Sequence, residues 1–122
     1  SKKYKMIEGS KYKIKSIICN KQKLNILFHD NYESEISAEL LRIESPSAEV
    51  QGHSKKEKIT PLNKNNVSIV NIEKVGNYAI RIIFDDGHDT GIYSWSYLRK
   101  VSENNIILYK NYLERVAKIK SV

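Results

Sequence analysis

The sequence is poor in several features that mark particular classes of protein. It has one cysteine and two prolines among 122 residues. One cysteine cannot form an internal disulfide, which favours a reducing compartment. We expect Cys19 to be a small buried residue of a strand. No run of about 18 apolar residues and no signal-peptide pattern is present. These absences predict a cytoplasmic protein with no membrane partner.

Arginine is also scarce. The formal net charge is +7, but only four of the 21 basic residues are arginine. Arginine makes the forked contacts that bases and phosphates favour, whereas a lysine-rich surface is typical of simple solvation. Nucleic acid is therefore not the expected partner, and a weak nucleic-acid binder is our third hypothesis. Salt-dependent affinity would be its signature.

Motifs for common chemistries are missing as well. The chain has no P-loop, no G-x-G-x-x-G, no C-x-x-C and no G-x-S-x-G. Neither His29, His53 nor His88 is followed two residues later by a carboxylate, which argues against a two-His-one-carboxylate iron oxygenase. Ser45 and Ser47 precede His53 without an obvious oxyanion loop. We therefore expect the chain not to be an enzyme by itself.

The apolar pattern predicts one α+β domain, because two cores are not expected at this length. We expect a flexible basic arm over 1–10, a domain over 11–101 and a C-terminal helix over 102–122 of the same domain. Period-two alternation predicts antiparallel strands. These strands are expected at 12–19, 24–28, 33–36, 67–75, 78–84 and 89–93.

Several local features refine this outline. Ser37 and Ser94 are expected to cap short helices over 38–42 and 95–100. The strand over 67–75 changes apolar phase after Ile69, which indicates a bulge, and the strand over 78–84 is expected near the middle of a sheet. A long irregular region over 44–66 separates the two sets of strands.

The last helix is expected to begin at Ser102. One stripe is expected to pack on the sheet, and it runs through Ile106, Tyr109, Leu113, Val116 or Ala117, and Lys120. Use of that apolar face for binding a partner is the alternative.

Residues 24–42 resemble residues 80–99. Phe28, Asp30 and Ile36 match Phe84, Asp86 and Ile92. After a one-residue shift, Ser37, Leu41 and Arg42 match Ser94, Leu98 and Arg99. The match predicts a small antiparallel, mainly-β domain of two similar units, each a strand, a turn, a strand and a helical turn.

The turn between the last two strands is the best local candidate for chemistry. Asp85, Asp86, His88 and Asp89 place three carboxylates and an imidazole close together in sequence. Such a group could hold a metal with His53, or pair a base with its orienting residue. The alternative is a solvated hairpin turn whose acidic side chains accept hydrogen bonds from backbone N–H groups.

Two longer motifs carry a family resemblance. L-L-R-I-E-S-P-S-A-E-V-Q-G-H (40–53) and V-G-N-Y-A-I-R-I-I-F-D-D-G-H-D-T-G-I-Y-S-W-S-Y-L (75–98) resemble the DUF971 family. This family is also known as the gamma-butyrobetaine hydroxylase-like N-terminal domain. The resemblance covers about 11–101 and implies a small mainly-β, α+β domain. In the hydroxylases the domain precedes an iron/2-oxoglutarate barrel and binds structural zinc, and a similar domain is appended to some P-loop iron–sulfur carriers.

The resemblance also implies where zinc would bind. Its three cysteine positions are Ser45, Ser47 and Val50 here, and its histidine position is His88. Serine and valine cannot replace thiolates in a tetrahedral zinc site. We therefore expect the zinc site to be lost, no cofactor to be bound, and His88 to hydrogen-bond the 45–50 loop through Ser45 or Ser47.

Our first hypothesis is a standalone, bacterial-type accessory domain. It would be non-catalytic and linked through a protein partner to iron–sulfur or 2-oxoglutarate-dependent oxygenase systems. The alternative is a metal-binding protein or enzyme that uses His88, His53, Asp86 and Asp89. The expected interaction surface is formed by Arg42, Ser45, Pro46, Ser47, Glu49, His53, Asp85, Asp86, Gly87, His88, Tyr93 and Trp95.

Overall fold

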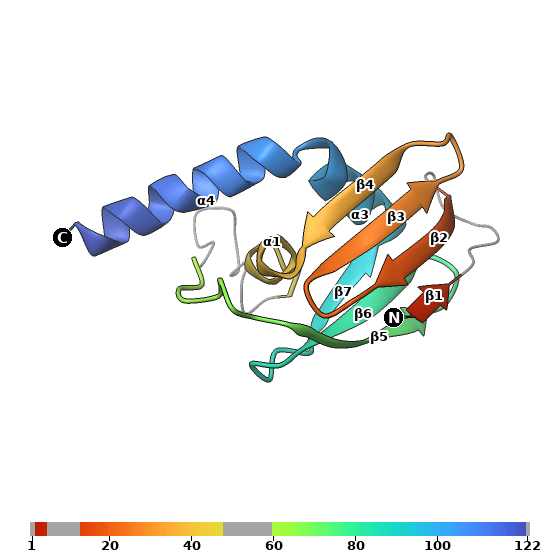
Figure 1. Ribbon diagram of the computed structural model, residues 1–122, viewed down its shortest axis with the longest axis horizontal. Helices are drawn as coiled ribbons and strands as arrows, with labels where there is room; N and C mark the ends of the chain where they lie inside the picture. The colour runs from red at the N-terminus through yellow and green to blue at the C-terminus, as the bar shows by residue number, and fades with distance from the viewer. Residues whose placement is uncertain (1, 5–12, 48–59, 122) are drawn as a thin grey trace.

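The computed structural model describes residues 2–4, 13–47 and 60–121. Within these residues the chain alternates strands with short helices and ends in a longer helix (Figure 1). The elements are β1 (Lys2–Tyr4), β2 (Ile14–Cys19), β3 (Lys23–Phe28), β4 (Glu33–Ser37), α1 (Ala38–Ile43), β5 (Ile69–Val75), β6 (Ala79–Phe84), β7 (Gly91–Ser94), α3 (Trp95–Glu103) and α4 (Asn105–Lys120).

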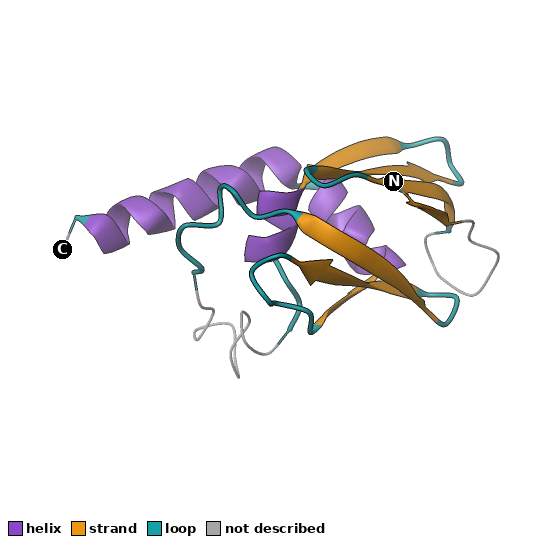
Figure 2. Cartoon of the chain, turned by 60° about the horizontal axis from the view of Figure 1, so that its bottom comes forward, coloured by secondary structure: helices purple, strands orange, loops and turns teal. Residues whose placement is uncertain are grey.

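The strands form two antiparallel sheets. Their orders are β1-β2-β3-β4 and β5-β6-β7, so β6 lies in the middle of its sheet as predicted. Figure 2 shows the sheets as two separate layers. Helix α3 contacts β4 of one sheet and β7 of the other. The α+β class and the antiparallel pairing are therefore confirmed.

One hydrophobic core joins the two sheets and the helices. Its largest fully buried side chains include Trp95, Tyr93, Phe28 and Phe84. Alternate residues of β3 are buried, which is the period expected for a strand with one face on the core. Because the aromatic residues come from both halves of the chain, each half completes the core of the other.

The internal repeat is confirmed as two β-β-β-α halves. The first half is β2-β3-β4-α1 and the second is β5-β6-β7-α3. Each first strand has a register shift near its start, between Ile14 and Ser16 and between Ile69 and Asn71. The Ser37 side chain accepts a hydrogen bond from Leu40 N at 3.1 Å and caps α1. Ser94 caps α3 in the same way.

Two expectations about the chain ends need correction. Lys2–Tyr4, predicted to belong to a loosely held arm, pair with β2, while 5–10 lie outside the described residues. The last helix does not begin at Ser102, because α3 continues to Glu103 and Asn104 separates it from α4. The Ser102 hydroxyl donates to Leu98 O at 2.7 Å, a bond inside a helix rather than a cap.

The C-terminal helix packs on the rest of the domain through only part of the predicted stripe, because Tyr109 lies against the core. Tyr112 is its buried residue, whereas Ile106 and Leu113 are exposed. Asn105 Nδ2 donates to Glu35 O of β4 at 3.0 Å, which ties the start of α4 to a sheet edge. No helix among the described residues is long and apolar enough to cross a membrane.

Candidate functional site

The turn between β6 and β7 directs His88 into the protein. The Phe84 N–H donates to His88 O at 3.0 Å, and the His88 N–H donates to Asp86 Oδ1 at 3.1 Å. Gly87 takes the φ of 89° that closes the turn. Asp86 therefore accepts a hydrogen bond from a backbone N–H group, as the hairpin-turn alternative predicted. The His88 side chain is directed inward, and the residue is 5% exposed.

His88 forms a buried polar cluster with two serines. Its Nε2 lies 2.8 Å from Ser45 Oγ and 3.4 Å from Ser47 Oγ. The Ser45 hydroxyl also donates to Ser47 Oγ at 3.2 Å. Ser45 is 0% exposed and Ser47 is 9% exposed. The predicted bond between His88 and the loop after α1 is therefore confirmed, and this cluster, Ser45–Ser47–His88, joins the two halves.

The donor set of this cluster does not fit a structural zinc ion. Two neutral hydroxyls and one imidazole stand where a tetrahedral site needs thiolates. Across the described ranges, no group of three His, Cys, Asp or Glu side chains could hold a metal. Asp89 is exposed and lies 3.6 Å from Arg81, and His53 is outside the described residues. The metal hypothesis that includes His53 stays a prediction.

A charged rim lies over the cluster. Asp86 Oδ2 pairs with Arg42 Nε at 2.8 Å and with Lys64 Nζ at 2.7 Å. Burial alone would raise the pKa of Asp86, but the hydrogen bonds from Lys64 and Arg42 lower that pKa well below its usual range. Two cations share this carboxylate, so the rim keeps one positive charge in excess. We call Arg42, Lys64 and Asp86 the charged rim.

Three residues support the cluster: Tyr93, which the sequence analysis placed at the interaction surface, and Tyr97 and Gly91, which it did not include in the site. The Tyr93 hydroxyl donates to Leu41 O, and burial raises its pKa above the ordinary value. The Tyr97 hydroxyl donates to Glu44 O at 2.6 Å. A Cβ atom on Gly91 would lie 2.5 Å from Ser45 Oγ, so Gly91 leaves room for the cluster. These contacts cross 46 or more residues and leave no local pattern; the signal for Gly91 is only its presence inside a strand.

The predicted interaction surface is corrected by burial. Tyr93 and Trp95 are 0% exposed and belong to the core, as Ser45 does. The Trp95 indole N–H donates to Asn77 O at 2.7 Å, which satisfies its polar atom inside the protein. Asp85 and Gly87 are exposed as predicted.

Some predicted residues at this surface lie elsewhere or outside the described ranges. Pro46 is half-buried beside the cluster. Glu49, Val50 and His53 fall in 48–59, outside the described residues. The described surface at the site is therefore the charged rim with Pro46, Asp85 and Gly87.

The distance between Ser45 and His88 is suitable for a nucleophile and its base. However, complete burial of Ser45 keeps a substrate carbonyl from its oxygen. The cluster also lies between packed elements, with the hydroxyl of Ser45 directly over Gly91. The geometry therefore supports a structural role that holds the loop after α1 against the β6–β7 turn.

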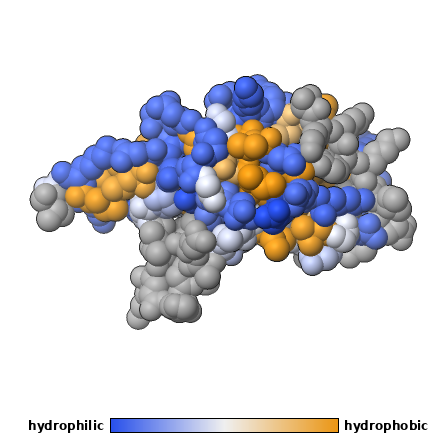
Figure 3. Space-filling view, turned by 90° about the horizontal axis from the view of Figure 1, so that it is seen from below, coloured by the Kyte–Doolittle hydropathy of each residue, from blue (hydrophilic) through white to orange (hydrophobic). Residues whose placement is uncertain are grey.

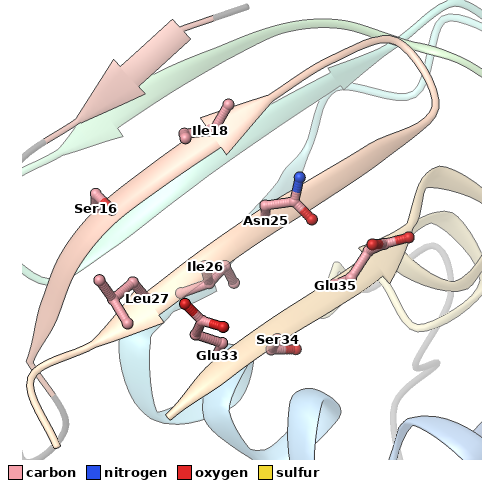
Figure 4. A pocket seen from close by; sticks show the side chains of 8 residues that line it. All are labelled: Ser16, Ile18, Asn25, Ile26, Leu27, Glu33, Ser34 and Glu35. Atoms are coloured by element: carbon pink, nitrogen blue, oxygen red, sulfur yellow. The ribbon is translucent and has the colours of Figure 1, made fainter. Parts of the chain in front are cut away.

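A hollow on the described surface lies elsewhere. It has a volume of about 450 Å³ on the outer face of β2, β3 and β4 (Figure 4). Its titratable side chains are Glu33 and Glu35, and Glu35 pairs with Lys23 at 3.1 Å. No histidine or cysteine lines it, so it offers no activated nucleophile. The residues lining it are Ser16, Ile18, Asn25, Ile26, Leu27, Glu33, Ser34 and Glu35.

Solved structures similar to this chain share its fold. One solution structure is 41% identical, with a TM-score of 0.77, and the match covers 94% of this chain and 88% of the other. A second is 33% identical, with a TM-score of 0.69, covering 85% and 87%. A crystal structure from Acidithiobacillus ferrooxidans, described as a DUF971 family protein of unknown function, is 32% identical. Its TM-score is 0.61, and the match covers 73% of this chain and 91% of the other.

The family comparison agrees with the motifs. Among curated proteins no match is found. The model of the family described as gamma-butyrobetaine hydroxylase-like, N-terminal, matches residues 16–99. This range contains the Ser45–Ser47–His88 cluster, the charged rim and both halves except for the first two residues of β2 and the last four of α3. The chain therefore belongs to the gamma-butyrobetaine hydroxylase-like, N-terminal family, also called DUF971.

Proposed function

We propose that this chain is a non-catalytic accessory domain of the cytoplasm that binds another protein through the charged rim and the β6–β7 turn. The observation that carries the proposal is the closed Ser45–Ser47–His88 cluster. Its serine is inaccessible, and its polar atoms bond within the protein. The cluster fixes the rim in place, and the rim remains available for recognition.

The charge of the rim indicates the kind of contact. Arg42 and Lys64 converge on a single carboxylate, and their side chains are 12% and 22% exposed. A partner that offers a carboxylate there would satisfy the excess positive charge. We propose that such partners belong to iron–sulfur assembly or to 2-oxoglutarate-dependent oxygenase systems, the two settings that the family resemblance implies.

The arginines weigh against nucleic acid as the partner. Each of the four pairs with a carboxylate of the protein: Arg42 with Asp86, Arg81 with Glu73, Arg99 with Asp30 and Arg115 with Glu44. The residues best suited to grip phosphates are thus engaged inside the molecule. The weak nucleic-acid hypothesis stays a prediction, to be tested by the salt dependence of binding.

The test measures binding of the full chain to a purified P-loop iron–sulfur carrier and to a purified 2-oxoglutarate oxygenase from the same cells. Calorimetry with Lys64→Glu is expected to show at least a tenfold loss of affinity for the true partner. Lys15→Glu is the matched control, because Lys15 is an exposed lysine of β2 that contacts Asn31. Turnover of a substrate by the isolated chain that disappears in His88→Ala would overturn the proposal.

A further inference from the structure

Helix α4 carries apolar side chains that nothing in the described chain covers. Ile106 is 87% exposed and Leu113 is 50% exposed, and Ala117 is also exposed. These positions are spaced by seven and four residues, so they share one side of a helix. The helix extends beyond the rest of the domain (Figure 1), and apolar atoms are exposed along it (Figure 3). We call Ile106, Leu113 and Ala117 the α4 stripe.

Other positions of the helix, from beside the stripe round to its far side, bond to the rest of the domain. The Tyr109 hydroxyl donates to Glu39 Oε1 at 3.0 Å, and the Tyr112 hydroxyl donates to Pro61 O at 3.1 Å. Arg115 Nε donates to Thr60 Oγ1 at 3.0 Å. These anchors fix the rotation of α4 about its axis. The α4 stripe is therefore presented to solvent in a defined orientation, which lowers the entropy lost on binding.

Helix α4 also lies outside the range that the family model matches. The family match ends at residue 99, and α4 begins at Asn105. Both sheets are complete before that point, although Val101 and Tyr112 still contribute to the core. The stripe lies on the exposed side of α4 and is not part of that core.

The charges around the stripe indicate its occupant. Lys110 and Lys120 lie on either side of the stripe on the helix surface. From 105 to 120 the helix has four basic residues and one acidic residue, Glu114. A second copy would bring two basic helices together, which is unfavourable, whereas an acidic helix would be attracted. No aromatic side chain belongs to the stripe, which differs from helices that lie in membrane interfaces.

We propose that the α4 stripe is the docking surface for an acidic amphipathic helix of a partner protein. Apolar residues seven apart on the partner would contact Ile106 and Leu113, and flanking carboxylates would face Lys110 and Lys120. This surface is separate from the charged rim, so the chain would join two proteins, one at each surface. The inference does not depend on the identity of the partner at the rim.

The test uses the full chain and two designed helical peptides with identical leucine positions, one flanked by glutamates and one by lysines. Chemical shifts of the backbone amides are recorded during titration. We expect the glutamate peptide to shift the amides of 106–120 and the lysine peptide to leave them unchanged. Ile106→Glu with Leu113→Glu should weaken this binding at least tenfold. Ile92→Glu, at an isoleucine of β7 that is 47% exposed, is the matched control and should leave it unchanged.

A charge reversal gives a second variant that keeps the stripe. Lys110→Glu with Lys120→Glu should exchange the preference, so that the lysine peptide binds better. Equal binding of both peptides, no binding, or binding that persists in the double glutamate variant would overturn the proposal. Dimerisation of the free chain in sedimentation, lost in Leu113→Glu, would assign the stripe to a second copy instead. Binding to phosphatidylserine vesicles without binding to the glutamate peptide would assign it to a membrane surface.

Discussion

The two halves of the domain build the same turn and use it differently. The Phe28 N–H donates to Tyr32 O at 2.9 Å, just as the Phe84 N–H donates to His88 O at 3.0 Å. Tyr32 therefore occupies in the first half the position of His88 in the second. The Tyr32 hydroxyl makes a 3.4 Å bond to Ser102 O, whereas His88 lies 2.8 Å from the Ser45 hydroxyl. In the first half, the Tyr32 side chain is held by one long hydrogen bond. In the second half, the His88 side chain belongs to a buried polar cluster.

Each half of the domain supplies an arginine that pairs with an aspartate of the other half. Arg42 of the first half pairs with Asp86 of the second, and Arg99 of the second pairs with Asp30 of the first. The charge balance of the two junctions is opposite. Arg99 bonds both Asp30 and Glu103, while two cations share Asp86. A duplicated scaffold thus has one junction saturated by carboxylates and one with spare positive charge, which is why only the second is proposed to bind a partner.

The largest expected difference between the halves is at Gly91 and its counterpart Ser34. Ile82 pairs with Gly91 as Ile26 pairs with Ser34. Ser34 already carries a Cβ atom, whereas a Cβ atom added to Gly91 would lie 2.5 Å from the Ser45 hydroxyl oxygen. Gly91→Ala should displace Ser45 and lower the free energy of unfolding by about 3 kcal/mol, the upper end of the usual cost of overpacking. Urea denaturation measures the change. Ser34→Ala is the control and should cost less than about 0.5 kcal/mol; equal losses would refute the difference.

Removing His88 should have the next largest effect. His88→Ala leaves two buried hydroxyls without their imidazole, and an unsatisfied buried polar group costs about 1–3 kcal/mol. Tyr32→Phe removes only the long bond to Ser102 O and should cost about 0.5 kcal/mol. Both changes are measured from urea midpoints at one pH. A Tyr32→Phe loss as large as that of His88→Ala would contradict the distinction between the two turns.

Local patterns predicted the repeated parts of the molecule well. Ser37 and Ser94 are capping residues followed by helix formers, and the phase change after Ile69 directly reports a bulge. The contact between His88 and Ser45 was predicted from aligned family positions. The caps and the bulge are encoded within a few residues, whereas the contact between His88 and Ser45 joins positions 43 residues apart and is reached only through the family resemblance of two motifs.

The features that were predicted wrongly, or not predicted at all, depend on residues far apart in the sequence. Tyr93 and Trp95 belong to the predicted interaction surface, but the register of β7 and the start of α3 bury them. The phase of α4 is set by Asn104, which separates two helices, and by contacts with Glu39 and Pro61. Lys64 lies in an irregular segment whose path no periodicity describes. These facts are set by tertiary packing.

The pH dependence of stability should separate the two aspartates. The pKa of Asp86 is lower in the folded protein than in the unfolded chain, where it is about 3.9. Its contribution is therefore present above about pH 4 and is lost as the pH falls below that value. Asp86→Asn should lower stability at pH 7 by about 1–2 kcal/mol and flatten the acid limb below pH 4. Urea unfolding at stepwise pH values measures both.

Asp30 supplies the matched control for that experiment. Its hydrogen bond with Arg99 lowers its pKa in the same direction, but its side chain is 57% exposed. Water screens an exposed pair strongly. Asp30→Asn should therefore change the acid limb less than Asp86→Asn does. An equal or larger change in the Asp30 variant would show that the Arg42–Asp86 and Arg99–Asp30 pairs contribute equally to stability. The excess positive charge at Asp86 would then have no effect on stability.

The smallest expected effect concerns the residue with positive φ in each turn. Gly87 has φ 89° and Asn31 has φ 67°. Nothing lies within 4 Å of a Cβ added to Gly87, so Gly87→Ala meets only backbone strain, worth about 1 kcal/mol. Gly87→Asn should cost less, because asparagine tolerates this conformation and already holds it in the first half. If thermal unfolding shows the asparagine variant to be the less stable of the two, the turns are not equivalent in backbone energetics, and the side chain at 87 must instead disturb the charged rim beside it.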